Sequence, residues 1–320
     1  MLCVIRKFYF IFVIFFINAC QFSQTDRVRV DQDLKTSYVK NEYSWWLKAA
    51  EAGDANAQNN LGVMYYKGKG VAQNYSQAIK WYTKAAEQGD AIAQSNLGRV
   101  YESGKGTTQD YKQAFDWYTK AAKKRNAAAQ YYLGAMYEEG LGVTQDYQQA
   151  LDWYSKAAEL RNAKTIEWGV ADAQLKLGQM YADGVGVAQD YKQAFDWYTK
   201  AAIQGNSQAQ NNLGTMYQHG KGTTQDYKQA FNLYNTAAMQ GNAVAQFNLG
   251  YLYSTGQGVS LDNKKSYIWL SIAAANGESR ALTTSVDIGR KLTAEELEET
   301  QRVVISIIND IEKNKKEKLQ

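Results

Sequence analysis

The sequence predicts an all-α solenoid of antiparallel helix pairs, because one short pattern recurs along it at a nearly constant spacing. Leu-Gly with a Tyr three residues further on begins at six positions: Leu61, Leu97, Leu133, Leu177, Leu213 and Leu249. The spacing is 36 residues, except for one interval of 44. A repeat of this length is one helical hairpin, which buries its apolar face only by stacking on its neighbours. The 320 residues also contain no Pro, which favours helices because Pro disrupts their interiors.

The first 19 residues have the pattern of an export signal. Basic residues precede ten apolar residues (8–17), too few to span a membrane as a helix. The tetrapeptide that ends at Cys20 resembles a bacterial lipobox, although Asn18 departs from it. The resemblance implies cleavage before Cys20, a lipid on Cys20 that binds the membrane, and a place in the bacterial cell envelope. By the same resemblance, Gln21 after the Cys favours attachment to the outer membrane, on its periplasmic or surface face. Simple secretion and an uncleaved membrane anchor are the alternatives.

Charge and cysteine content restrict the function classes further. Cys3 and Cys20 are the only cysteines, so the mature chain needs no disulfide framework. The net charge is +4, and loss of residues 1–19 removes two bases and no acid, which leaves about +2. No basic stripe follows, so nucleic acid is excluded as the expected partner. Residues 20–40 are polar and are predicted to form a tether.

Residues 41–277 are predicted to contain one half repeat and six full repeats. In the first full repeat, Ala57, Leu61 and Tyr65 lie on one stripe of a helix. Glycines at 68 and 70 end that helix, and Asn74 is the expected cap of the second one. The buried stripe of the second helix is predicted at Ala78, Trp81, Ala85 and Ala86. Gly62 and these alanines allow close helix contact, with the large aromatic residues filling the remaining volume.

These residues resemble the Sel-one-like repeat, a relative of the tetratricopeptide repeat. The resemblance rests on Ala57-Gln58, Leu61-Gly62, Tyr65, Gly68, Gly70-Val71, Tyr75, Ala78, Trp81, Lys84-Ala85-Ala86 and Gly89. It implies a right-handed superhelix of helix pairs that acts as an adaptor or scaffold, in some bacteria during host-cell interaction. Arg125 and Arg161 replace the closing Gly, which predicts strained or extended helix ends. Extra residues 163–170, with Trp168, are expected to form a loop or a longer helix, or else a contact point for a partner.

Both ends of the repeat array have features of caps. Residues 43–53 match a second helix without its first helix, which would cover the first full repeat. At the other end, residues 278–320 are predicted to form a capping helix and a charged tail. Thr293-Ala294-Glu295-Glu296 is a capping-box pattern that would begin this helix. Its predicted apolar stripe is Leu297, Val304, Ile308 and Ile311.

The sequence offers no convincing catalytic set, so we predict a protein that is not an enzyme and has no cofactor and no metal site. The only His is His219, beside a loop glycine, and the Gly-Lys-Gly stretches lack the Gly-Lys-Ser/Thr order of a phosphate loop. Ser37-x-x-Lys40 has a form found in penicillin-binding enzymes, but the partner motifs are missing. An enzyme acting on β-lactam or peptidoglycan stays as one alternative, and a structural envelope spacer as another.

The predicted binding surface is the groove lined by the first helices of the pairs. Three positions of that helix vary between copies while Leu, Gly and Tyr do not, and the tetratricopeptide resemblance implies that they face the groove. The predicted groove positions are Asn59, Val63, Tyr66, Arg99, Glu102, Tyr131, Glu138, Leu175, Gln179, Asn211, Thr215, Phe247 and Tyr251. Their aromatic members are the kind that anchor protein partners. We therefore expect an extended or helical segment of another protein to bind there, unless these are merely unconstrained surface positions.

Overall fold

The computed structural model describes residues 42–160 and 169–319, with side chains as far as Lys313, and all regular structure in these ranges is helical. The predictions for residues 1–41, including Cys20 and Ser37, lie outside this part of the chain, as do those for Arg161 and Trp168. No described helix combines the length and the apolar character that a membrane crossing requires. The chain divides into two compact units, and the boundary lies between Trp117 and Tyr118.

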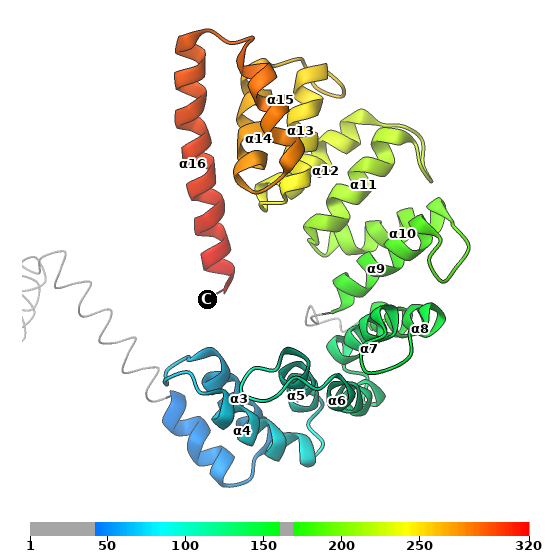
Figure 1. Ribbon diagram of the computed structural model, residues 1–320, viewed down its shortest axis with the longest axis vertical. Coiled ribbons are helices and arrows are strands. Elements are labelled where there is room, and N and C mark those ends of the chain that lie inside the picture. Colours follow the sequence, from blue (N-terminus) through cyan, green and yellow to red (C-terminus); the bar gives the residue numbers. More distant parts are fainter. Residues whose placement is uncertain (1–41, 161–168, 320) are drawn as a thin grey trace, which may run out of the picture. The chain divides into compact units, whose positions relative to one another are not determined.

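The first unit consists of helical residues 42–51 followed by helix pairs (Figure 1). Its further helices are α3 (Ala55–Lys67), α4 (Tyr75–Glu87), α5 (Ala91–Ser103) and the beginning of α6 (Tyr111–Lys123). Residues 42–51 cover α3 as the half-repeat pattern indicates. Ala50 packs in a buried cluster with Ala57, Leu61 and Trp81, and the Tyr43 and Tyr65 hydroxyls lie 2.9 Å apart.

The second unit continues the same alternation of first and second helices. Its helices after α6 are α7 (Ala127–Glu139), α8 (Tyr147–Ala158), α9 (Val170–Asp183), α10 (Tyr191–Ile203), α11 (Ser207–His219), α12 (Tyr227–Met239), α13 (Ala243–Thr255), α14 (Asn263–Ala275), α15 (Ser279–Gly289) and α16 (Ala294–Leu319). The first helices α3, α7, α9, α11 and α13 each pack against the second helix of their own repeat. The second helices α4, α8, α10, α12 and α14 each pack against the helix that follows. The predicted helix-pair architecture is therefore confirmed.

Local signals set the helix ends. The Asp54 carboxylate accepts a hydrogen bond from the Ala57 N–H at 2.7 Å, which caps α3. At the C-terminal end of α7, Gly140 takes a left-handed conformation with φ of 70° and ends the helix. Arg125 occupies the same kind of position after α6 with φ of 62°, so the strain predicted at this residue is confirmed.

The glycine of the Leu-Gly pair is required by a tyrosine that the sequence analysis left out. A Cβ added to Gly62 would lie 2.5 Å from Cδ1 of Tyr82, so only glycine allows this contact without a shift. The equivalent tyrosines in the second unit are buried: Tyr118, Tyr154, Tyr198 and Tyr234. Trp81 is buried as predicted, but Trp153 and Trp197 are only half-buried. In the pairs α3/α4, α7/α8, α9/α10 and α11/α12, the tyrosine is thus the aromatic residue that packs on the Leu-Gly glycine, whereas Leu270 takes this place against Gly250.

A buried glutamine links each repeat to the second helix before it. In every full repeat this glutamine donates to a backbone carbonyl near the end of that helix; Gln58 Nε2, for example, lies 3.0 Å from the Ala50 oxygen. In four of these repeats the oxygen of the glutamine accepts a hydrogen bond from an amide 30 residues further on, as in the 2.7 Å bond from Gln88 to Gln58. The bond recurs at Gln204–Gln174, Gln240–Gln210 and Asn276–Gln246. Two glutamine oxygens, on Gln94 and Gln130, are buried without a partner among the described residues.

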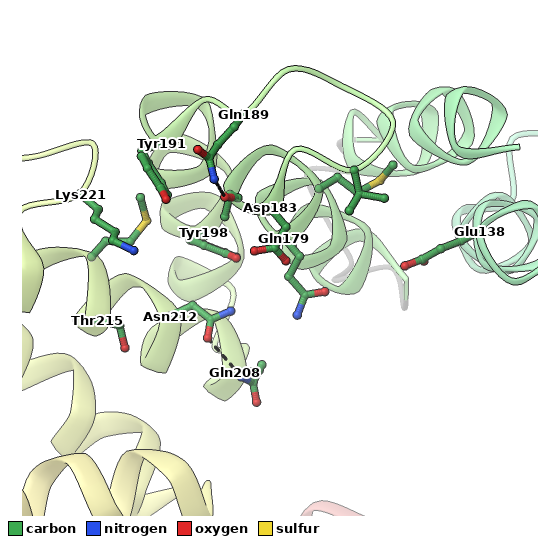
Figure 2. Close-up of a pocket in the computed structure, with 14 residues that line it drawn as sticks. Glu138, Gln179, Asp183, Gln189, Tyr191, Tyr198, Gln208, Asn212, Thr215 and Lys221 are labelled. Carbon is green, nitrogen blue, oxygen red and sulfur yellow. Dashed lines mark hydrogen bonds between the residues drawn. The ribbon is translucent and has the colours of Figure 1, made fainter.

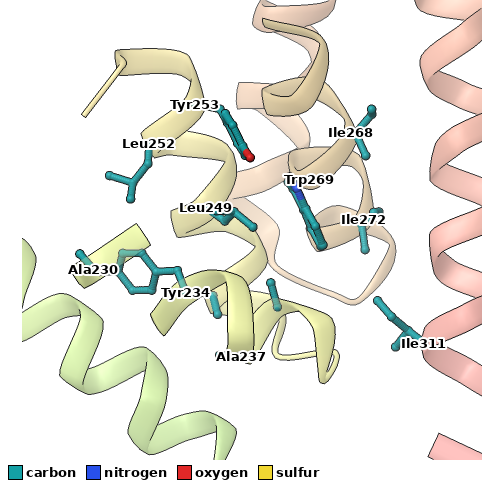
Figure 3. Close-up of a cluster of buried hydrophobic side chains, with 12 residues drawn as sticks. Ala230, Tyr234, Ala237, Leu249, Leu252, Tyr253, Ile268, Trp269, Ile272 and Ile311 are labelled. Carbon is teal, nitrogen blue, oxygen red and sulfur yellow. The ribbon is translucent and has the colours of Figure 1, made fainter. Parts of the chain in front are cut away.

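The C-terminal end contains one more helix than predicted. The capping box is confirmed, because Glu296 and Thr293 exchange backbone-to-side-chain hydrogen bonds of 2.9 and 3.2 Å. Ile311 of α16 is buried in a cluster with residues of α12, α13 and α14 (Figure 3). Before it, α15 aligns with the first helix of a further repeat, in which Ser285 stands at the Leu position.

Candidate functional site

The second unit contains a cavity of about 490 Å³ on the side formed by the first helices α7, α9 and α11 (Figure 2). Three consecutive repeats contribute to it. Its lining residues are Glu138, Gln179, Met180, Ala182, Asp183, Val185, Gln189, Tyr191, Tyr198, Gln208, Asn212, Thr215, Met216 and Lys221. The lining therefore combines carboxamides, two acids and one lysine with an apolar base of methionine and tyrosine.

At one end of the cavity, Glu138 is held by two partners. The Tyr154 hydroxyl donates to its carboxylate, and Lys176 Nζ lies 2.9 and 3.1 Å from its two oxygens. Burial, and then the hydrogen bond to this carboxylate, raise the pKa of Tyr154 well above the usual tyrosine value. Since the Glu138 charge is already paired, it is poorly suited to act as a general base.

In the centre of the cavity, the side chain of Tyr198 extends from α10 between α9 and α11 (Figure 2). Asn212 forms a side-chain hydrogen bond with the Tyr198 hydroxyl. Desolvation raises the pKa of Tyr198 to about 12, and the nearby charge of Asp183 adds to this increase. The hydroxyl therefore stays protonated at neutral pH and is a hydrogen-bond donor.

The other walls are polar and are positioned by short-range bonds. Gln189 donates to the Ala182 carbonyl at 2.8 Å, which fixes the loop after α9. Gln208 donates to the Asn212 side chain at 3.2 Å on α11. Lys221 places its ammonium group 5.1 Å from the centre of the Tyr191 ring. Carboxamides both donate and accept, so these walls match the alternating N–H and C=O groups of a peptide.

Of the predicted groove residues in the second unit, the structure brings three together in the cavity: Glu138, Gln179 and Thr215. Tyr131 instead packs against Tyr154, with ring centres 5.6 Å apart. Leu175 packs against the buried cluster of α10 and α11. Phe247 lies beneath the guanidinium of Arg280 at 4.5 Å, whereas Tyr251 is 40% exposed.

In the first unit, the predicted residues form a separate cluster around Tyr66. Its ring contacts Tyr75 edge-on at 5.2 Å, and the cations of Arg99 and Lys105 lie 5.9 and 5.8 Å from its centre. Glu102 is half-buried on the same helix as Arg99. Val63 packs against the buried cluster of α4 and α5.

Two predicted groove positions are buried, which corrects the view that they face a partner. Asn59 and Asn211 are 5% and 4% exposed. Asn96 donates to Asn59 at 2.9 Å, and Asn248 donates to Asn211 at 3.0 Å, in each case from the following repeat. These asparagines join neighbouring first helices and leave little surface for a ligand.

The residues that form the middle of the cavity are not among the predicted groove positions. Asn212 lies one position after a predicted residue, so comparing one more helical offset between copies would have found it. Tyr198 gave no signal of its own, because tyrosine recurs at its position in other repeats and the position does not vary as a binding position would. In the part of the chain that the structure describes, no three His, Cys, Asp or Glu side chains gather as a metal site would need.

Comparison with known proteins identifies the family. Among solved structures, a protective antigen from uropathogenic Escherichia coli strains with an SLR fold is 35% identical, with a TM-score of 0.69 over 85% of this chain and 56% of that one. A Sel1 repeat protein from Oxalobacter formigenes is 34% identical, with a TM-score of 0.67 over 79% of this chain and 74% of that one. This chain thus spans little more than half of the first relative.

Among curated proteins, no match to the chain was found. The sequence profile of the Sel1 repeat matches residues 43–54, 55–90, 91–126, 127–162, 171–206, 207–242 and 243–278. These matches omit the extra residues near 163–170 and follow the helix pairs of the structure. With matched repeats along nearly all of residues 43–278, the chain belongs to the Sel1 repeat family.

Proposed function

We propose that the chain is a scaffold that binds an extended segment of another protein along the first helices of its second unit. Sel1 repeat proteins generally act as protein–protein interaction scaffolds and are typically non-catalytic. The observation that carries the proposal here is the carboxamide-lined cavity across α7, α9 and α11. An extended peptide leaves its backbone N–H and C=O groups unpaired, and Gln179, Gln208 and Asn212 can pair with both.

The charges of the cavity support a binding role over a catalytic one. Glu138 is paired with Lys176, and the Tyr198 hydroxyl stays protonated at neutral pH. The Tyr198 hydroxyl is therefore not prepared for proton transfer at neutral pH, which needs a pKa near the working pH. A polar cavity with a protonated phenol and paired charges is instead suited to hold a ligand in one orientation.

Site-specific photo-crosslinking tests the proposal. A photoreactive residue placed at Gln179, inside the cavity, should give a defined crosslinked product with a partner in the native cells. The matched control is the same residue at Asp196, which is exposed on α10 outside the cavity lining. Equal products from both positions, or peptide maps that show no single contacted segment, would count against a groove on this side.

We also propose that the chain is exported and is attached to the bacterial envelope by a lipid on Cys20. The support is the signal-like pattern before Cys20 in the sequence. Metabolic labelling with a radioactive fatty acid should label the chain and should fail to label Cys20→Ser. Label retained by the Cys20→Ser variant would show that another residue carries the lipid.

A further inference from the structure

One repeat of the second unit lacks a side chain that its two neighbours use. In the third full repeat, the Tyr154 hydroxyl of the second helix donates to Glu138 on the first helix. In the fifth, the Tyr234 hydroxyl donates to the Gln218 carboxamide oxygen at 2.7 Å. The equivalent position in the fourth repeat is Ala182, which has no acceptor. The Tyr198 hydroxyl therefore cannot be paired from its own repeat in this way.

The space left by the short side chain is the cavity itself. Ala182 lines it, next to Asp183 on α9. Figure 2 shows Asp183 and Tyr198, which line it as well. Asn212 also lines the cavity, and its side chain is a hydrogen-bond partner of the Tyr198 hydroxyl. A hydroxyl can both donate and accept, so the Tyr198 hydroxyl can donate to an acceptor that enters the cavity while its oxygen accepts from Asn212.

The surrounding groups select the chemistry of that acceptor. The exposed carboxylate of Asp183 accepts hydrogen bonds and repels an anion, whereas Tyr198 offers a donor. A primary carboxamide satisfies both, because its oxygen accepts from Tyr198 while its NH₂ group donates to Asp183. A carboxylate would meet the exposed charge of Asp183 and has no N–H group to donate to it, and an ammonium group would leave the Tyr198 proton unpaired.

We propose that this cavity is a specificity pocket for the carboxamide of a glutamine side chain on the bound segment, which takes the place that Gln218 occupies in the next repeat. The inference rests on the proposed peptide-binding function, because it names the side chain that such a peptide inserts. It makes Ala182 a specificity-determining residue. A glutamine at residue 182 would supply the missing carboxamide from the chain itself and close the pocket.

The test uses the purified chain, labelled with ¹³C in its methionine methyl groups, and the probe N-acetyl-L-glutamine N-methylamide. Met180 and Met216 line the cavity, and exposed Met239 serves as an internal control on α12. The probe should shift the Met180 and Met216 signals and leave that of Met239 unchanged. The corresponding glutamate derivative should bind about tenfold more weakly, since about one hydrogen bond is lost and a charge is added.

Three variants separate the pocket from general effects. Ala182→Gln should weaken probe binding at least about tenfold, because the added side chain occupies the site. Tyr198→Phe should weaken it comparably while keeping the aromatic ring. Ser254→Gln, the same substitution in the sixth repeat, should leave binding unchanged. Circular dichroism must show equal helix content in all three chains.

The outcomes distinguish this inference from the proposed function. Absence of shifts at Met180 and Met216, equal binding of the two derivatives, or full binding by a folded Ala182→Gln chain would overturn the glutamine pocket. None of these results depends on the partner. A crosslinked partner from Gln179 together with a negative probe titration would retain the scaffold and reject the pocket. A positive probe titration without a crosslinked partner would retain the glutamine pocket and count against the scaffold.

Discussion

At the scale of single residues, Arg125 stores strain that a substitution can release. It ends α6 in the left-handed region, where glycine stands in most other repeats. A side chain with a Cβ is unfavourable there, so Arg125→Gly should raise the free energy of unfolding by roughly 0.5–1 kcal/mol, after the larger entropy of an unfolded glycine is subtracted. Urea denaturation measures the change. Arg125→Ala is the control, and an equal gain from alanine would assign the effect to the lost arginine side chain.

Residue-level features that depend on local backbone geometry could be predicted from the sequence. The strain at Arg125 and the capping box at Thr293 need only neighbouring residues, and both are present. The burial of Asn59 could not be predicted in this way, because its partner Asn96 lies in the next repeat. The contact of Tyr82 with Gly62 likewise depends on the rotation of one helix against another.

At the scale of helices, the buried glutamine of each repeat predicts a stabilising substitution in the third one. Gln130 has an unpartnered oxygen because the position 30 residues later is Leu160, where four of the other repeats have a carboxamide. Leu160→Gln should form the missing bond and add about 1 kcal/mol to the free energy of unfolding. Thermal or urea denaturation checks it. Gln204→Leu should lower the free energy of unfolding by a similar or larger amount. If both variants changed the free energy of unfolding in the same direction, the glutamine bond would not be the stabilising interaction.

The contact of α16 with α14 predicts a second effect at this scale. Ile311 is 4% exposed in the cluster of Figure 3, whereas Ile305 on the same helix is 62% exposed. Ile311→Ala should cost about 2–4 kcal/mol by leaving a cavity, and it should speed amide exchange along α16. Ile305→Ala should change neither quantity. Similar exchange in both variants would mean that α16 is not held through this cluster.

The same elements show where sequence patterns stop being informative. The amphipathic stripe and the cap predicted α16, but α15 escaped because it lacks the Leu-Gly signature of a first helix. Three lining residues of the cavity, Glu138, Gln179 and Thr215, could be predicted from the sequence, since they occupy variable positions of first helices. The space beside Ala182 could not be predicted in this way. It exists because the alanine side chain is short while the residues around it, which come from other helices, are large.

At the scale of the whole molecule, the recurring buried tyrosine couples stability to alkaline pH. Tyr198 and Tyr234 lie on equivalent positions of α10 and α12, and desolvation raises the pKa of each to about 12 from the ordinary value of 10.0. The unfolded chain releases these protons near pH 10, whereas the folded chain keeps them until about pH 12. The stabilisation is thus complete below pH 10 and is lost between about pH 10 and 12.

Each of these tyrosines should lower the free energy of unfolding by about 1.4 kcal/mol per pH unit within that interval. Urea titrations from pH 9 to 12 measure the slope, and absorbance of the phenolate reports its ionisation. Tyr198→Phe removes one of the titrating hydroxyls, so the free energy of unfolding of this variant should fall less steeply with pH, by the contribution of one tyrosine. The lost bond to Asn212 changes the free energy by an amount that does not depend on pH, so it leaves the slope unaffected. Lysines that titrate in the same range contribute equally to both chains. A variant slope equal to that of the parent chain would show that Tyr198 is not held neutral by the fold.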